Sequence, residues 1–336
     1  MTATDETAQL YERFATNQAA GTSPTYEALA HAVAADPGVL ELVTALPAPK
    51  RQPNLLFGVA TMFGAPLTDP DAFTDWVTAN WARVRPEILA RSTQTNEAAR
   101  CATLLPAFLT IPGPLALIEV GASAGLTLYP DRYRYDYGRG IVGDGPGPVL
   151  PCDWSTPQGY AAQPPERVPT VAWRGGLDLN PLDLTRDDDR DWLTALVWPE
   201  HHERRDRITE ATELVRADPP HVIRGDLLTD LPALVAEAPS DATVVIFHSA
   251  VLSYVEPDDR RRFADLVRDL PGHWIANEGV GVMADLGIPE PTEPTPEGAP
   301  RFLTALDGIP VAWSGPHGQA CHWFGSGRMT DMLAPS

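Results

Sequence analysis

The residues whose types and spacing most clearly suggest chemistry lie in a glycine-rich segment. It reads EVGASAG (119–125) and directly follows an apolar run typical of a buried strand. Glycines let the backbone approach a ligand closely, and the start of a following helix presents free N–H groups. We therefore expect a helix after this segment and a nucleotide-type ligand held by Glu119, Gly121, Ser123 and Gly125.

The same segment also fits a G-x-S-x-G nucleophile elbow. Ser123 would then be the nucleophile, and an acidic residue with His317 or His322 would complete a triad. Such hydrolases place several strands before the nucleophile, whereas residues 1–110 look helical, and no HGG-type segment precedes it. The dinucleotide-binding G-x-G-x-x-G spacing does not fit. A glycine turn with a purely structural role is the third alternative.

A nucleotide-type cofactor also needs a carboxylate at the tip of the second strand, to accept hydrogen bonds from its ribose hydroxyls. Asp136 lies 17 positions after Glu119, slightly short of the roughly 20 residues expected, and is the first choice. Asp178, in GLDLNP, has a more typical context but requires a large insertion before the second strand. Either residue could instead be a solvated turn residue.

Further candidates lie where later strands should end, because ligands bind outside the carboxyl ends of parallel strands. Asp226 could accept a hydrogen bond from an adenine amino group or cap the following helix. His248, at the end of the strand expected within 243–252, is the first candidate for a general base, followed by Glu278 and Glu97. A structural role is the alternative for His248.

Two kinds of structure in succession must position these side chains. Residues 1–111 show the three- and four-residue spacing of apolar positions typical of amphipathic helices and predict an all-helical cap. Over 112–336, strand-like runs alternate with helical patterns, which predicts an α/β domain with a mainly parallel sheet. The last two strand-like runs predict an antiparallel hairpin at the sheet edge. Segments 138–172 and 283–300 are rich in Pro and Gly and predict an insertion or long loops.

Several motifs, taken together, resemble a bacterial family of unknown function. They are RSTQTNEAARCATLLPA (91–107), LIEVGASAGL (117–126), DRYRYDYG (131–138), RGGLDLNPLDL (174–184), LVWPE (196–200), IRGDLL (223–228) and FHSAVLSYV (247–255). The family is similar to class I S-adenosylmethionine-dependent methyltransferases with a helical N-terminal region. Their first motif is acidic-x-Gly-x-Gly-x-Gly, in which Ser123 here replaces the middle glycine. The resemblance implies a Rossmann-like fold, S-adenosylmethionine as cofactor and methyl transfer to a small molecule. A non-catalytic ligand-binding protein of the same fold is the alternative.

The family pattern also marks a polar cluster within an apolar helical region, formed by Gln94, Thr95, Asn96, Glu97 and Arg100. Burying such groups is costly unless each finds a hydrogen-bond partner. The cluster could line a substrate pocket between the helical cap and the sheet, or it could be the exposed start of a helix. Trp198 leaves the same two alternatives open.

Composition excludes several classes of partner. The chain has 45 Asp and Glu against 25 Lys and Arg, a formal net charge of -20, which disfavours nucleic acid and anionic membrane surfaces. Its 3 cysteines lie far apart without a C-x-x-C pair, which disfavours disulfide frameworks and thiolate zinc sites; we expect no metal. No apolar run approaches the roughly 20 residues of a membrane span, and no signal peptide is evident. We expect a cytoplasmic protein whose oligomeric state the sequence leaves undetermined.

Overall fold

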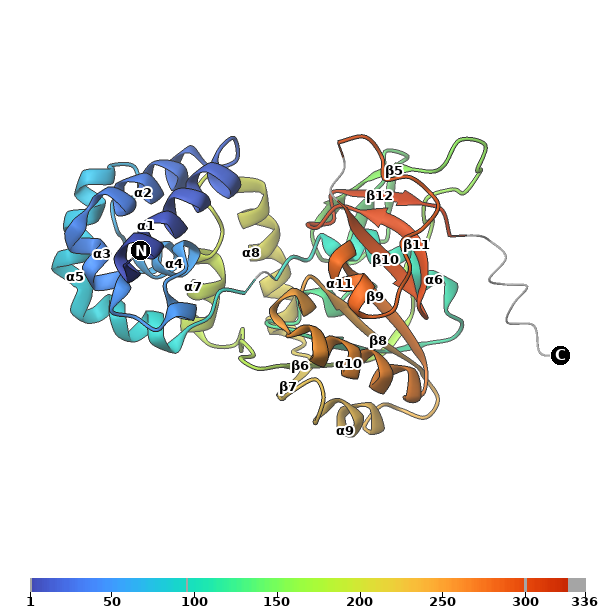
Figure 1. Cartoon of the computed structure of the whole chain (residues 1–336). Helices are drawn as coiled ribbons and strands as arrows, with labels where there is room; N and C mark the ends of the chain where they lie inside the picture. The colour runs from blue at the N-terminus through green and yellow to red at the C-terminus, as the bar shows by residue number, and fades with distance from the viewer. Residues whose placement is uncertain (1, 95, 299–300, 326–336) are drawn as a thin grey trace. The chain divides into compact units, whose positions relative to one another are not determined.

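The computed structural model describes residues 2–94, 96–298 and 301–325, which form two compact units (Figure 1). The first unit comprises the described residues of Met1–Thr95 together with Asp183–Thr209. The second comprises Asn96–Leu182 and the described residues of Glu210–Ser336. Thr95 of the polar motif lies outside the described residues.

The boundary therefore differs from the one predicted at 111/112. Helix α6 (Arg100–Thr110) packs on strands of the second unit rather than among the N-terminal helices. Residues 183–209, which were predicted as part of the α/β domain, belong to the helical unit instead. Amphipathic periodicity identifies a helix but does not say which neighbour covers its apolar face.

The first unit is helical, as predicted. It contains α1 (Ala3–Phe14), η1 (Ala15–Ala19), α2 (Pro24–Ala35), α3 (Pro37–Thr44), η2 (Ala48–Lys50), α4 (Pro53–Met62), α5 (Pro70–Ala90), α7 (Asp187–Ala195) and the start of α8 (His202–Ala217). Helix α2 begins as its sequence predicts, since Ser23 accepts a hydrogen bond from the Tyr26 N–H and Pro24 follows. The buried ring of Phe57 contacts several aromatic rings and centres the core of the unit.

Nine strands of the described residues form the main sheet of the second unit. Their spatial order is β5 (Asp153–Ser155), β12 (Ala320–Trp323), β11 (Ile309–Ser314), β10 (Phe302–Leu306), β9 (His273–Gly279), β8 (Thr243–Ser249), β1 (Leu115–Val120), β6 (Val171–Asp178) and β7 (His221–Arg224). Strands β7, β6, β1, β8 and β9 are parallel and, numbered along the chain, follow the order 3-2-1-4-5. The predicted α/β class is thus confirmed.

The predicted antiparallel hairpin joins β11 to β12. The sheet continues beyond this hairpin, because the short strand β5 pairs in parallel with β12. The hairpin therefore lies one strand inside the sheet edge.

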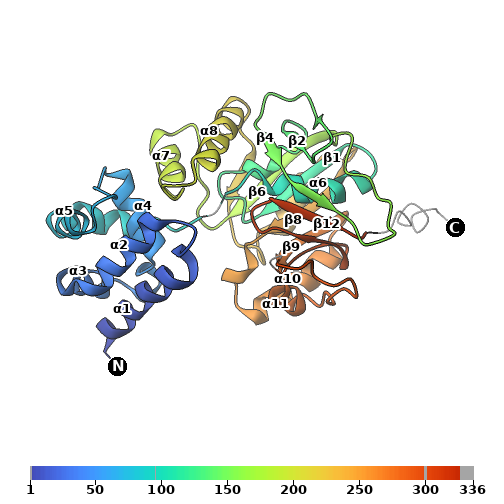
Figure 2. The same ribbon diagram turned by 90° about the horizontal axis from the view of Figure 1, so that it is seen from above.

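Different elements cover the two faces of the sheet. One face packs on α9 (Leu231–Ala236), α10 (Pro257–Asp269) and α11 (Val280–Asp285) through a continuous apolar core. Helix α6 lies on the opposite face, where the rings of Phe108 and Phe247 meet edge to face at 5.4 Å. Figure 2 shows α6, β2 and β4 on one side of β8 and β9, with α10 and α11 on the other.

The helix expected after the glycine-rich segment is absent, and that prediction is wrong. Only a 3-10 turn, Leu126–Leu128, follows, and the chain then builds a small sheet of β3 (Ile141–Val142), β2 (Arg134–Asp136) and β4 (Val149–Pro151). The guanidinium of Arg174 on β6 donates to both carboxylate oxygens of Asp131 at 2.6 Å and ties this segment to the main sheet. The insertion predicted at 138–172 thus contains short strands. In the other Pro-rich segment, residues 286–298 form a loop.

Two hairpin glycines offer a matched test of how the β11–β12 turn packs. Gly318 and Gly308 have φ of +83° and +80°. A Cβ on Gly318 would lie 1.9 Å from the carbonyl oxygen of Ala99, whereas a Cβ on Gly308 would have no atom of the described residues within 4 Å. Gly308→Ala should cost about 1–2 kcal/mol of unfolding free energy for the left-handed backbone alone. Gly318→Ala should lower the free energy of unfolding clearly more, because its Cβ also meets the Ala99 backbone. Urea unfolding of the two variants measures the difference. Equal losses would contradict this packing.

Candidate functional site

The strand order of the second unit marks one edge of the sheet as the expected ligand site. In the order 3-2-1-4-5, the chain changes direction across the sheet between β1 and β8. Ligands of such sheets bind outside the carboxyl ends of the strands at this switch point. Residues that end β1, β6, β7 and β8, and the segments that cross them, therefore form the candidate site.

The glycine-rich turn that follows β1 has a backbone that requires its glycines. Gly121 and Gly125 both have φ of +74°, and Ser123 has φ of +51°. A Cβ on Gly121 would lie 2.0 Å from a methyl group of Val251, and one on Gly125 would lie 2.8 Å from Pro220. The turn is therefore packed against its neighbours as well as conformationally restricted. Ser123 is a non-glycine residue in this strained region.

Asn96 holds this turn from both sides. Its side-chain N–H donates to the carbonyl oxygen of Ala122 at 2.8 Å, and its side-chain oxygen accepts from the Leu126 N–H at 3.0 Å. Asn96 is buried, so these bonds satisfy polar groups that water does not reach. Asn96 was predicted to bind substrate, and its contacts in the structure are with the turn.

Asp178, rather than Asp136, ends the second parallel strand. Its carboxylate accepts hydrogen bonds from the Ser123 N–H at 2.9 Å and from the Asn180 N–H at 2.7 Å. Asp136 lies on β2 of the small sheet, where it accepts from the Gly138 N–H. The first choice of Asp136 for the second strand is thus wrong, because the chain makes a long excursion before β6 begins.

Glu119 points from β1 into a buried polar cluster. It is 4% exposed and accepts a hydrogen bond from the Thr127 hydroxyl through Oε1. Its Oε2 has no hydrogen-bond partner among the described residues, and the same holds for the buried Ser123 hydroxyl. Burial raises the pKa of Glu119 to about 8, although the Thr127 hydroxyl and the charge of Arg100 act in the opposite direction.

Arg100 spans the ends of two strands. Its guanidinium donates to the carbonyl oxygen of Ser249, the last residue of β8, at 3.0 Å and to that of Pro316, in the β11–β12 turn, at 2.9 Å. Glu97, from the same segment, is fully buried and accepts from the Ala99 N–H at 3.2 Å. Segment 96–100 therefore crosses the switch point.

The remaining residues of the predicted substrate site lie in the helical unit. Gln94 is half-buried there. The indole N–H of Trp198 donates to the side-chain oxygen of Asn54 at 3.1 Å, and its rings pack beside Phe14 and Tyr26. These contacts give Trp198 a place in the aromatic core of the first unit.

The structure brings His248 and Glu278 together but buries both on the face of the sheet opposite Glu119. Glu278 accepts from His248 Nδ1 at 2.9 Å and from the backbone N–H groups of Val251 and Leu252. The imidazole is fully buried beside Phe263. This arrangement fixes the loop that follows β8, and it gives neither side chain contact with solvent.

Exposed groups lie at the ends of β6 and β7. Asp226 is exposed and accepts from the Leu228 N–H at 2.8 Å, whereas Asp230 is the residue that precedes α9. Leu179, directly after Asp178, is 65% exposed. Leu179 could not be predicted from the sequence, because exposure of a single apolar residue depends on the tertiary fold. An acidic and an apolar group thus stand beside Asp178.

The predicted nucleophile Ser123 does not share a hydrogen bond with His322. His322 instead bonds to Ser155 and Glu293. The described residues contain no group of three or more His, Cys, Asp or Glu side chains arranged to hold a metal ion. In the same residues, no helix is long and apolar enough to cross a membrane.

A family model described as an uncharacterized protein conserved in bacteria (DUF2332) matches residues 8–323. The chain therefore belongs to this family. No curated protein and no solved structure matches it.

The buried Glu119 predicts a specific dependence of stability on pH. The pKa of Glu119 is raised from its ordinary value of 4.5 to about 8, so between these pH values the folded state holds a proton that the unfolded state has released. The stabilisation of the folded state by this proton is fully present below pH 4.5 and is lost as the pH rises through 8, at up to about 1.4 kcal/mol per pH unit.

Glu119→Gln cannot lose this proton. We expect the free energy of unfolding of this variant to match that of the wild type at pH 5 and to exceed it by about 2–4 kcal/mol at pH 8.5. Urea unfolding at pH 5, 7 and 8.5 measures this difference. Glu41→Gln, which removes an exposed carboxyl group of α3, is the matched control. A constant difference between wild type and Glu119→Gln would show that Glu119 does not titrate in this range.

Proposed function

We propose that the second unit binds S-adenosylmethionine at the carboxyl edge of β1, β6 and β7 and transfers its methyl group to a small molecule. The observation that carries the proposal is the meeting of two elements at the switch point. The glycine turn after the first strand donates through the Ser123 N–H to Asp178, the acid that ends the second strand, at 2.9 Å. A cofactor with a polar tail and a ribose requires both elements side by side.

The end of β6 fits the nucleoside part of the cofactor. A carboxylate offers about four acceptor positions, and the carboxylate of Asp178, at the end of β6, would receive the ribose hydroxyls. The exposed side chain of Leu179 supplies an apolar surface for a flat purine ring. Asp226, exposed at the end of β7, can accept a hydrogen bond from the exocyclic amino group.

The turn and Glu119 fit the methionine part. Its carboxylate would accept a hydrogen bond from the Ser123 hydroxyl, which is buried and has no hydrogen-bond partner among the described residues. The backbone N–H groups of Gly121, Ala122 and Ser123 already donate to β6. Its ammonium group would bind Oε2 of Glu119, to which none of the described residues donates a hydrogen bond. The sulfonium of the bound cofactor supplies an activated methyl group, so the protein has mainly to orient the acceptor and exclude water.

An acceptor that carries a proton also needs a base. His248 and Glu278 bond to each other and are buried on the face of the sheet opposite Glu119. Glu97 lies in the segment that crosses the strand ends, and it would act as the base. The large negative charge of the chain favours a neutral or cationic acceptor.

Titration calorimetry with S-adenosylmethionine and S-adenosylhomocysteine tests the cofactor. At least one should bind below millimolar concentration, and Asp178→Asn should weaken binding at least about tenfold, because a charged hydrogen bond contributes about 1.5–3 kcal/mol. Asp136→Asn removes a comparable carboxylate from the small sheet and should leave the affinity unchanged. Failure of both ligands to bind at millimolar concentration would refute the proposal.

Glu119 should couple cofactor binding to proton release. Because the free protein holds Glu119 protonated below pH 8 and an ammonium group requires the ionised form, affinity should rise between pH 6 and 7.5, by up to about tenfold per pH unit. Calorimetry in two buffers of different ionisation enthalpy measures the protons released. In Glu119→Gln both the pH dependence and the proton release should disappear. Affinity that does not change with pH in the wild type would remove Glu119 from the site.

A further inference from the structure

Three side chains at the other end of the main sheet are joined by hydrogen bonds in an order that suits nucleophilic catalysis. Ser155 ends β5 and is the register partner of His322 on β12. The Ser155 hydroxyl lies 2.8 Å from His322 Nδ1, and His322 Nε2 lies 3.2 Å from a carboxylate oxygen of Glu293. Strands β8 to β11 separate β12 from β1, so this cluster is distinct from the switch point.

The hydrogen bonds determine which nitrogen carries the proton. A carboxylate only accepts, so Glu293 holds the imidazole with its proton on Nε2. The lone pair of Nδ1 is then directed at the Ser155 hydroxyl, which donates to it. A nucleophile that donates to a base, with that base oriented by an acid, is the arrangement required for an activated serine.

Glu293 is itself held in place, although it lies in a loop. Its backbone carbonyl oxygen accepts a hydrogen bond from the indole N–H of Trp313 on β11 at 2.9 Å. The side chains of Glu293 and His322 are 27% and 13% exposed, respectively. The acid and the base are therefore partly shielded, whereas Ser155 is exposed and accessible to a substrate.

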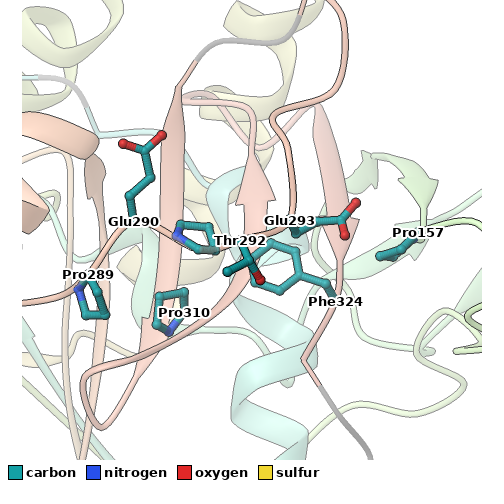
Figure 3. A pocket seen from close by; sticks show the side chains of 8 residues that line it. Pro157, Pro289, Glu290, Thr292, Glu293, Pro310 and Phe324 are labelled. Carbon is teal, nitrogen blue, oxygen red and sulfur yellow. The ribbon is translucent and has the colours of Figure 1, made fainter.

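A cavity of about 370 Å³ lies beside this cluster. Its lining includes Glu293, together with Pro157, two residues after Ser155, and Phe324, two residues after His322. Figure 3 shows the Phe324 ring beside Thr292 and Glu293, with Pro157 beyond the Glu293 carboxylate. Prolines and an aromatic ring make an apolar wall, and the Glu290 and Glu293 carboxylates disfavour an anionic ligand.

We propose that Ser155, His322 and Glu293 form a second active centre that hydrolyses small uncharged esters. The Ser155 oxygen attacks the carbonyl carbon while its proton moves to His322 Nδ1. The bond to the alcohol oxygen breaks as His322 returns that proton to the leaving group. Water then attacks the acyl carbon and gives its proton to His322, which returns it to the Ser155 oxygen as the acid leaves.

Covalent labelling with an alkyl fluorophosphonate tests the nucleophile. The serine oxygen displaces fluoride from phosphorus, so the intact mass should show one adduct and peptide mapping should locate it on Ser155. Ser155→Ala should not be labelled, whereas Ser253→Ala, which removes an exposed serine elsewhere in the unit, should be labelled at the wild-type rate. An unlabelled Ser155 in the wild type would overturn the proposal.

The rate of labelling tests the base and the acid. His322→Gln should slow it at least about 100-fold, since general base catalysis contributes about 10²–10⁴-fold, and Glu293→Gln should slow it at least about tenfold. Glu293 lies in a loop, so its variant reports on the mechanism even if the His322 variant unfolds. Labelling that is equally fast in Glu293→Gln and the wild type would overturn the proposal. The Ser155–His322 hydrogen bond would then only hold β5 on the sheet. Neither result depends on whether the chain binds S-adenosylmethionine.

Discussion

The second unit depends on a polar segment buried across the ends of its central strands. Buried polar groups must find partners, and those of Asn96 and Arg100 bond to the backbone: Asn96 to the glycine turn and Arg100 to the end of β8 and to the β11–β12 turn. Segment 96–100 thus ties together three parts of the chain that lie far apart in the sequence. The close approach of Gly318 to Ala99 follows from the same packing.

The hydrogen bonds of Asn96 explain how the glycine turn keeps its position without the expected helix after β1. Helix α6, which precedes β1, covers the face beside the small sheet, and the glycine turn is held by Asn96 rather than by a helix that continues from it. The backbone N–H groups of Gly121, Ala122 and Ser123 donate to β6 and also hold the turn at the switch point. Glu119, which lies just before the turn, has one carboxylate oxygen without a hydrogen-bond partner in the described part of the chain.

Much of the fold could be predicted because apolar runs identify β1, β8 and β9 directly. Strand β6 could not be predicted, because Gly175 and Gly176 weaken the strand pattern. The structure shows why Gly176 is needed, since a Cβ there would lie 2.6 Å from the Cβ of Ala122 in the turn. The spacing rule that selected Asp136 assumes a short crossover, and the excursion before β6 breaks that assumption. Likewise, His248 and Ser249 both end β8 but face opposite sides, and the sequence does not tell which side faces Arg100.

The proposed methyl transfer depends on binding of S-adenosylmethionine at the edge formed by β1, β6 and β7. A crystal structure of the chain grown with S-adenosylhomocysteine tests this binding. We expect density for the ligand with its ribose at Asp178, its purine ring against Leu179 and its ammonium group at Glu119. Ligand density elsewhere on the protein would refute binding at this edge. So would a structure grown at a saturating concentration of S-adenosylhomocysteine that shows no ligand and an unchanged Glu119–Thr127 cluster.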